Sequence, residues 1–274
     1  MEGLPKKEEK NLRHFDKVIG VPENQHESFK EYITKEDRIT YLKYLEQKSG
    51  SLEKTSEEKY MIDFAQNVAD IYAKKYGNEN PYYITEDSIL IQEKTRDICN
   101  PISGIITLNR EEYKSLFVCK MFHEMIHLKS YISLQETNQQ EKNHRKIAPA
   151  RSGFSVYSRD GKIKRLENVE EALTGYLEQV FFKEHIKEHP FFAEDLKTHG
   201  NPEIGRKKEL SDLIKIIDEI LEKNPDDFKH KEEILDMFLR AKFQGNLLSV
   251  ARLIEKSFGP GSVHSFAEKT KKEI

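Results

Sequence analysis

The sequence is poor in cysteine and in long apolar runs. Its two cysteines, Cys99 in a polar stretch and Cys119 in an apolar one, do not make a disulfide framework. No run of about eighteen apolar residues occurs, so no transmembrane helix is expected. The opening stretch MEGLPKKEEKNLRHF has no apolar segment typical of a signal peptide. We therefore expect a soluble, cytoplasmic protein without a membrane partner.

An excess of charge of one sign is also missing. The 45 Lys and Arg residues nearly balance the 48 Asp and Glu residues, which leaves a net charge of -3. Basic stretches such as GRKKE and EKTKKE alternate with acids, a pattern typical of solvated helix faces. No surface that would attract nucleic acid is predicted.

Apolar residues recur every three or four positions over much of the chain, which predicts a mainly helical protein. Thr55 and Glu58 form a capping box that opens one helix, and Gly77 ends it. β-Branched and aromatic residues predict strands over 82–92 and 103–109.

Two further local signals follow these strands. Asn109 and Glu112 form a second predicted capping box, which opens a helix that runs to about Tyr131. The pair Asp160-Gly161 predicts a hairpin turn, and helical spacing returns after it.

The stretch LFVCKMFHEMIHLKSY (116–131) carries three polar residues in an otherwise apolar helix. His123 and His127, four residues apart, lie on one helix face and can bind one zinc ion at about 2.0–2.1 Å. Glu124 lies about 100° further round and can instead take a proton from a water on the ion. Burying these groups without partners would cost roughly 1–3 kcal/mol each, so a metal is favoured over two ordinary core histidines.

Two histidines do not complete a site, and several residues could supply the third ligand. Ser130 and Ser133 stand where an H-E-x-x-H-x-x-G-x-x-H motif has glycine and histidine, so that extension is absent. The remaining candidates, in order of preference, are Glu171 in a downstream helix, Cys99, His144 and Cys119. Cys119, one turn before His123, is better suited to packing beneath the metal.

Taken together, HEMIH (123–127) and EEALTG (170–175) resemble the gluzincin type of zinc metallopeptidase, the thermolysin-like group. The resemblance implies that His123, His127 and Glu171 bind Zn²⁺ and that Glu124 is the general base. It also implies that the strand 103–109 is an edge strand that lies beside the helix and pairs with an extended substrate.

Two positions depart from that family pattern. Glu170 stands where asparagine is usual, and Gly175 stands where an acidic residue often orients a ligand histidine. The partner of that histidine must therefore come from elsewhere or be missing. A donor for the developing oxyanion is also needed, and the candidates are Tyr157, then Tyr176, then His144.

We expect an α+β, mainly helical protein with a zincin-like catalytic region, a short antiparallel or mixed sheet and a helical C-terminal region. Residues 1–30 are expected to be a disordered or loosely held arm, 31–200 the catalytic domain and 201–274 the helical region. The predicted function is a zinc-dependent peptidase that hydrolyses peptides or proteins through a metal-bound water with Glu124 as general base. The alternatives are a catalytically inactive zinc-binding module and a deformylase-like hydrolase with Cys99 as third ligand.

Overall fold

The computed structural model describes residues 15–48, 51–93, 95–141, 144–269 and 272–273. The fold is α+β and mainly helical, as expected. The α-helices of this part are α1 (His26–Lys48), α2 (Ser56–Lys75), α3 (Lys114–Lys129), α4 (Glu167–Phe181), α5 (Ala193–His199), α6 (Lys207–Lys223), α7 (Lys231–Gln244), α8 (Leu247–Phe258) and α9 (Ser262–Lys269).

The strands form two small mixed sheets. They are β1 (Lys17–Ile19), β2 (Ile89–Gln92), β3 (Ile98–Asn100), β4 (Ile105–Asn109), β5 (Ile132–Glu141), β6 (His144–Ser152), β7 (Ser155–Tyr157), β8 (Ile163–Arg165) and β9 (Lys272–Glu273). One sheet has the order β1-β5-β6-β7-β8-β9, with only β1 and β5 parallel. The other has the order β2-β4-β3, with β2 and β4 parallel.

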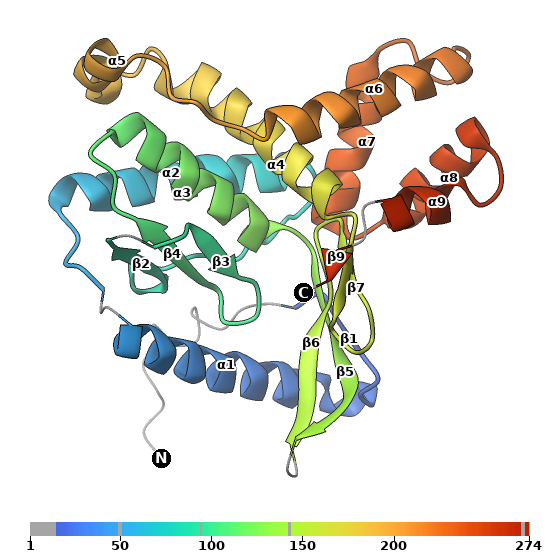
Figure 1. The fold of residues 1–274 in the computed structure, drawn as a ribbon, viewed down its shortest axis with the longest axis horizontal. Helices are drawn as coiled ribbons and strands as arrows, with labels where there is room; N and C mark the ends of the chain where they lie inside the picture. The colour runs from blue at the N-terminus through green and yellow to red at the C-terminus, as the bar shows by residue number, and fades with distance from the viewer. Residues whose placement is uncertain (1–14, 49–50, 94, 142–143, 270–271, 274) are drawn as a thin grey trace.

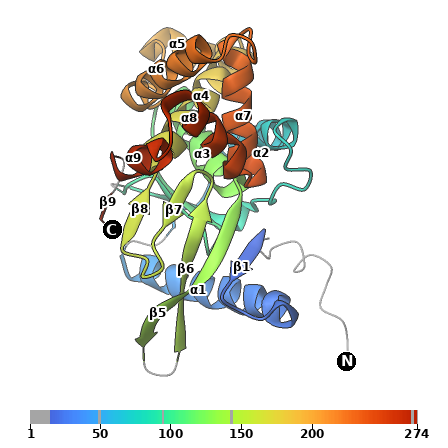
Figure 2. The same ribbon diagram turned by 90° about the vertical axis from the view of Figure 1, so that its right-hand side faces the viewer.

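The small β2-β4-β3 sheet lies between helices. Helices α2 and α3 pack against each other above it, and α1 runs beneath it (Figure 1). Leu42 of α1 packs on Leu90 and Ile105 on the lower face of this sheet. Helix α4 crosses over α3, and α6 to α9 gather beyond it, above the larger sheet (Figures 1 and 2).

Strand β4 is not the edge strand that the family resemblance implied. It pairs with β2 on one side and with β3 on the other, so both of its sides carry ladder hydrogen bonds. The outer strand of the described sheet on the side of α3 is β3, a three-residue element that also carries Cys99. The prediction was wrong because the three-residue segment Ile98–Asn100, for which no strand was predicted, pairs with β4 on the side away from β2.

The N-terminal arm predicted for residues 1–30 is wrong for the described part of that range. Residues 17–19 form β1, which pairs with β5, and α1 already begins at His26. Phe15 is fully buried against Ile132 and Leu134. Residues 1–14 lie outside the described residues. Buried side chains such as Phe15 and Val18, together with pairing to β5, attach a segment that has no apolar period.

Other local predictions met mixed outcomes. The capping box of Thr55 and Glu58 is present at the start of α2, and β7 and β8 form the hairpin expected at Asp160-Gly161. By contrast, the polar stretch after α3 forms the long β5–β6 hairpin, which the sequence pattern did not predict.

Helix α3, which carries His123 and His127, is capped by a distant residue. The predicted capping box of Asn109 and Glu112 is absent, because α3 begins at Lys114. Instead the carboxylate of Asp195 in α5 accepts hydrogen bonds from the backbone N–H groups of Lys114 and Ser115, at 3.0 and 2.8 Å. Asp195 thereby satisfies two of the backbone N–H groups that have no partner within the helix at the N-terminus of α3, the positive end of the helix dipole.

We expect Asp195→Ala to lower the free energy of unfolding by about 1–2 kcal/mol, the usual cost of a lost N-cap. Urea unfolding followed by circular dichroism measures this change. Glu112→Ala is the matched control, because Glu112 is exposed and should shift stability by less than about 0.5 kcal/mol. Equal unfolding midpoints for the two variants would contradict the role of Asp195.

The expected division near residue 200 does not separate two hydrophobic cores. One cluster of buried residues extends from Met61 in α2 to Ile254 in α8 and includes the apolar face of α3. The C-terminal helices therefore pack directly on the helices that carry the metal-site motifs. In the described residues no helix combines the length and the apolarity needed to cross a bilayer.

Candidate metal centre

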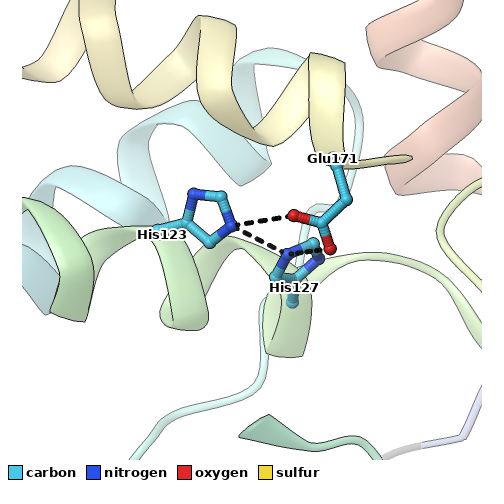
Figure 3. A group of neighbouring side chains, drawn as sticks. All are labelled: His123, His127 and Glu171. Carbon is cyan, nitrogen blue, oxygen red and sulfur yellow. Dashed lines mark hydrogen bonds and ion pairs between the residues drawn. The ribbon is translucent and has the colours of Figure 1, made fainter. Parts of the chain in front are cut away.

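Helices α3 and α4 bring three predicted ligands together. His123 and His127 project from α3, and Glu171 projects from α4 toward both rings (Figure 3). One ligand atom from each residue lies within 4.8 Å of the other two. Glu171 was predicted from the sequence as the third member, and the packing of two helices places it there.

The spacing of the donor atoms matches a tetrahedral zinc site. Two ligands at about 2.0–2.1 Å from one ion, at the tetrahedral angle, stand about 3.3–3.4 Å apart. The Nε2 atoms of His123 and His127 are 3.2 Å apart. Oε2 of Glu171 lies 3.4 Å from Nε2 of His123, and Oε1 of the same carboxylate lies 3.6 Å from Nε2 of His127. The residues present therefore fit a zinc ion.

A separate carboxylate orients each imidazole. Nδ1 of His123 lies 3.1 Å from Glu178 Oε2, and Nδ1 of His127 lies 2.9 Å from Glu170 Oε1. A ring that donates its Nδ1–H in this way keeps the Nε2 lone pair free. Both Nε2 atoms then face the same point as acceptors, an arrangement that a cation between them stabilises.

Glu171 has a ligand oxygen without a hydrogen bond. Its Oε2 is buried and accepts none within the described structure, although Nε of Arg206 lies 3.0 Å away as an ion pair. Burial raises the pKa of Glu171, but the charges of His127, His123 and Arg206 hold that pKa well below its usual range. The low pKa favours the ionised carboxylate, and its buried Oε2 accepts no hydrogen bond, both of which suit a metal ligand.

Glu170 is a buried carboxylate with several partners. Its Oε1 also forms an ion pair with Lys242 of α7, and its Oε2 accepts a hydrogen bond from the backbone N–H of Phe154 at 2.8 Å. Burial raises the pKa of Glu170, but Lys242 and His127 lower it to about 2. A side chain at Gly153 would collide with this carboxylate, since a Cβ there would lie 2.1 Å from Oε2.

The pKa values of two buried groups, His123 and Lys242, are shifted in opposite directions. Burial lowers the pKa of His123, but hydrogen bonds to Glu171 and Glu178 and the nearby charges raise it to about 10. Burial lowers the pKa of Lys242, and Glu170 opposes that effect. The carboxylates thus favour a positive charge at His123 Nε2, where a proton and a metal ion compete for the same lone pair.

Glu124 differs from the other carboxylates of the site. It lies on α3 beside His123, and its charge contributes to the raised pKa of that histidine. It is half-buried, and no hydrogen bond or ion pair of the described residues engages its carboxylate. Glu124 is therefore free to accept a proton, whereas Glu170, Glu171 and Glu178 are held by partners.

A larger residue than glycine would not fit at position 175 without a shift of the backbone that covers it. A Cβ there would lie 2.6 Å from the backbone nitrogen of Arg206, so the 205–206 segment passes directly over α4 at this point. The same segment supplies Arg206 to Glu171, and Gly205 N–H donates to Glu178 Oε2 at 3.0 Å. The acidic residue expected near this position is replaced by Glu178, one turn further along α4.

The other candidate residues lie outside the three-residue group. Among the described residues that group contains neither Cys99 nor Cys119, and Cys119 is fully buried on α3, one turn before His123. His144 lies in β6, and its side chain is outside what the structure describes. These positions leave Glu171 as the third ligand that the geometry favours.

The two tyrosines considered as oxyanion donors occupy different surroundings. Tyr157 lies near Lys164, whose Nζ is 5.6 Å from the ring centroid, and burial raises the pKa of Tyr157. Tyr176 lies near Tyr76 and Asp236, on the side of α4 that faces α7. No hydrogen bond or ion pair among the described residues joins either phenol to the metal cluster, so an oxyanion role for Tyr157 stays a prediction.

Sequence reasoning missed the residues that support the ligands. Glu178 was recoverable, because it follows Glu171 by seven residues and so lies on the same helix face. Glu170 was considered only as a possible misassignment of Glu171. Arg206 and Lys242 gave no local signal, because both resemble ordinary charged residues of solvated helices.

Comparison of the chain with family models, with curated proteins and with solved structures gives no match.

Proposed function

We propose that the chain is a zinc-dependent peptidase with a zincin-like catalytic region of the gluzincin type. The observation that supports this most directly is the spacing of His123, His127 and Glu171, which matches three corners of a zinc tetrahedron. The HEMIH helix above a small sheet, with a ligand glutamate from the next helix, agrees with that assignment.

Three protein ligands favour a catalytic rather than a structural ion. Structural zinc sites are usually closed by four protein ligands, whereas catalytic sites keep one position open. In the described residues the cluster contains three ligand residues, and the unpaired carboxylate of Glu124 lies next to it. A purely structural zinc would not require such a base.

Zinc bound by these residues would make a water more acidic and polarise the substrate carbonyl. His123 and His127 would hold the ion through Nε2, while Glu178 and Glu170 keep the rings in place. Glu124 would take a proton from the attacking water at a carboxylate oxygen and pass it to the nitrogen of the leaving amine.

Purified protein should contain about one zinc per chain by elemental analysis. A chelator should abolish hydrolysis of a mixed peptide library, and zinc should restore it. A protein that binds no zinc even at saturation contradicts the proposal completely. Zinc binding without hydrolysis of any peptide would instead favour an inactive zinc-binding module.

A further inference from the structure

Lys242 is a fully buried cation in the C-terminal helix α7. Its side chain has 0% exposure, and its ammonium forms an ion pair with Glu170 and donates to Thr174 Oγ1 at 2.9 Å. A lysine is almost never buried completely unless its charge is paired. The C-terminal region therefore places a costly charge directly behind the proposed metal site.

Both partners of Lys242 face His127. Glu170 Oε1, which pairs with Lys242, also accepts from His127 Nδ1 at 2.9 Å. Thr174 Oγ1 lies 3.5 Å from the same Nδ1 and donates to the backbone oxygen of Glu170 at 2.8 Å. Lys242 thus acts on the imidazole through an intermediate residue and does not contact the ligand atom Nε2.

The backbone around Lys242 is tied to the end of α3. Tyr131 N–H donates to the carbonyl of Lys242 at 3.1 Å, and Gly153 N–H donates to the carbonyl of Tyr131 at 2.7 Å. Arg151 donates to the carbonyl of Ala241 at 2.8 Å. The ammonium is therefore held at a defined position relative to α3 and to Glu170.

We propose that Lys242 is a positioning residue of the zinc site, which fixes Glu170 in the orientation that directs His127 toward the ion. This inference rests on the proposed zinc site. The proposal makes metal affinity dependent on α7, a helix that supplies none of the three residues of the described group.

Two effects of removing Lys242 oppose each other. Loss of a nearby positive charge would strengthen metal binding by Coulomb attraction. Loss of the partner that fixes Glu170 would weaken it, as removal of an outer partner of a ligand histidine typically does, by about 10–100-fold. We expect the positioning effect to dominate, because it moves the His127 ring that would supply the ligand atom, whereas Lys242 acts on the ion only through Glu170.

The test compares the full-length wild type with Lys242→Met. Zinc affinity, measured by competition with a chromophoric chelator, should fall by about 10–100-fold. The visible spectrum of the cobalt-substituted protein should also change, because the His127 ring is less firmly oriented. Unchanged or tighter zinc binding would overturn the proposal.

A double-variant cycle separates positioning from a general structural role. If Lys242 acts through Glu170, the variant Glu170→Gln/Lys242→Met should bind zinc no more weakly than Glu170→Gln alone. Losses that simply add would show that Lys242 acts by another route. If Lys242→Met does not fold, Lys242→Gln keeps a donor without the charge and enters the same cycle.

Lys129→Met is a matched control. Lys129 is also fully buried and pairs with Asp70 at 2.6 Å, away from the carboxylates of the metal site. It should lose stability in thermal unfolding and keep its zinc affinity. If the wild type binds zinc but hydrolyses no peptide, only the proposed peptidase function is refuted. If the wild type is active and Lys242→Met binds zinc as tightly as the wild type, only the role of Lys242 is refuted.

Discussion

We expect Glu124→Gln to reduce peptide hydrolysis by about 10²–10⁴-fold or more while the protein keeps its zinc, because a general base typically contributes a factor of that size. The amide has nearly the shape of the carboxylate but cannot accept the proton. Since Glu124 is not in the ligand group, zinc content should stay at the wild-type value. Turnover of a cleaved peptide and elemental analysis measure the two quantities.

The matched control is Glu112→Gln, a change of the same chemistry at an exposed carboxylate before the same helix. It should keep both zinc and activity. Hydrolysis by Glu124→Gln within a few-fold of the wild type would exclude Glu124 as the base. Loss of zinc from Glu124→Gln would instead indicate that this carboxylate helps to hold the ion.

A second large effect is expected from Glu171→Ala, which should release most of the zinc. The loss should exceed the roughly 10–100-fold that removal of an outer partner causes, because Glu171 supplies a ligand atom itself. It also leaves His123 and His127 as the remaining ligands of the described cluster. Competition with a chelator of known affinity measures this change.

Cys99→Ser distinguishes the competing third ligand. Cys99 lies in β3 and is outside the ligand group, so its serine variant should keep wild-type zinc affinity. Zinc retained in Glu171→Ala and lost in Cys99→Ser would transfer the third-ligand role to the thiol. That result would favour the deformylase-like alternative.

The charged groups around the two histidines do not balance when both imidazoles are neutral. Two buried carboxylates, Glu170 and Glu178, and the half-buried carboxylate of Glu171 lie against the imidazoles. Lys242 and Arg206 are the cationic side chains that pair with them. With neutral imidazoles this set carries one negative charge in excess, which is costly away from water. Either a proton on His123, whose pKa is raised to about 10, or a cation between the Nε2 atoms would offset that excess.

Several features of the site could be predicted from residue spacing alone. The interval between His123 and His127 equals one helical turn, so their common face follows from helix geometry wherever the helix lies. The ligand role of Glu171 came from a resemblance in a short motif, and the geometry agrees with it. The packing role of Cys119 also agrees with its complete burial.

Predictions that depended on distant partners were less successful. The N-terminal cap of α3 is Asp195, eighty residues away from Ser115, and not the local pair Asn109 and Glu112. Strand β4 lies inside its sheet because β3 pairs with it from the other side. In each case the local sequence pattern agreed with the prediction, but the hydrogen bonds that decided the outcome were made by residues outside that pattern: Asp195 for α3, and β3 for β4.

The sequence by itself determined the helix that carries two imidazoles and a carboxylate, because a period of 3.6 residues needs no tertiary contact to set directions. Only the tertiary structure decided that Glu178 and Glu170 contact those imidazoles and that Lys242 pairs with Glu170. The reason is physical: a buried charge is stabilised by whatever opposite charge the packing brings within a few ångströms, and the separation of residues along the chain does not specify that distance.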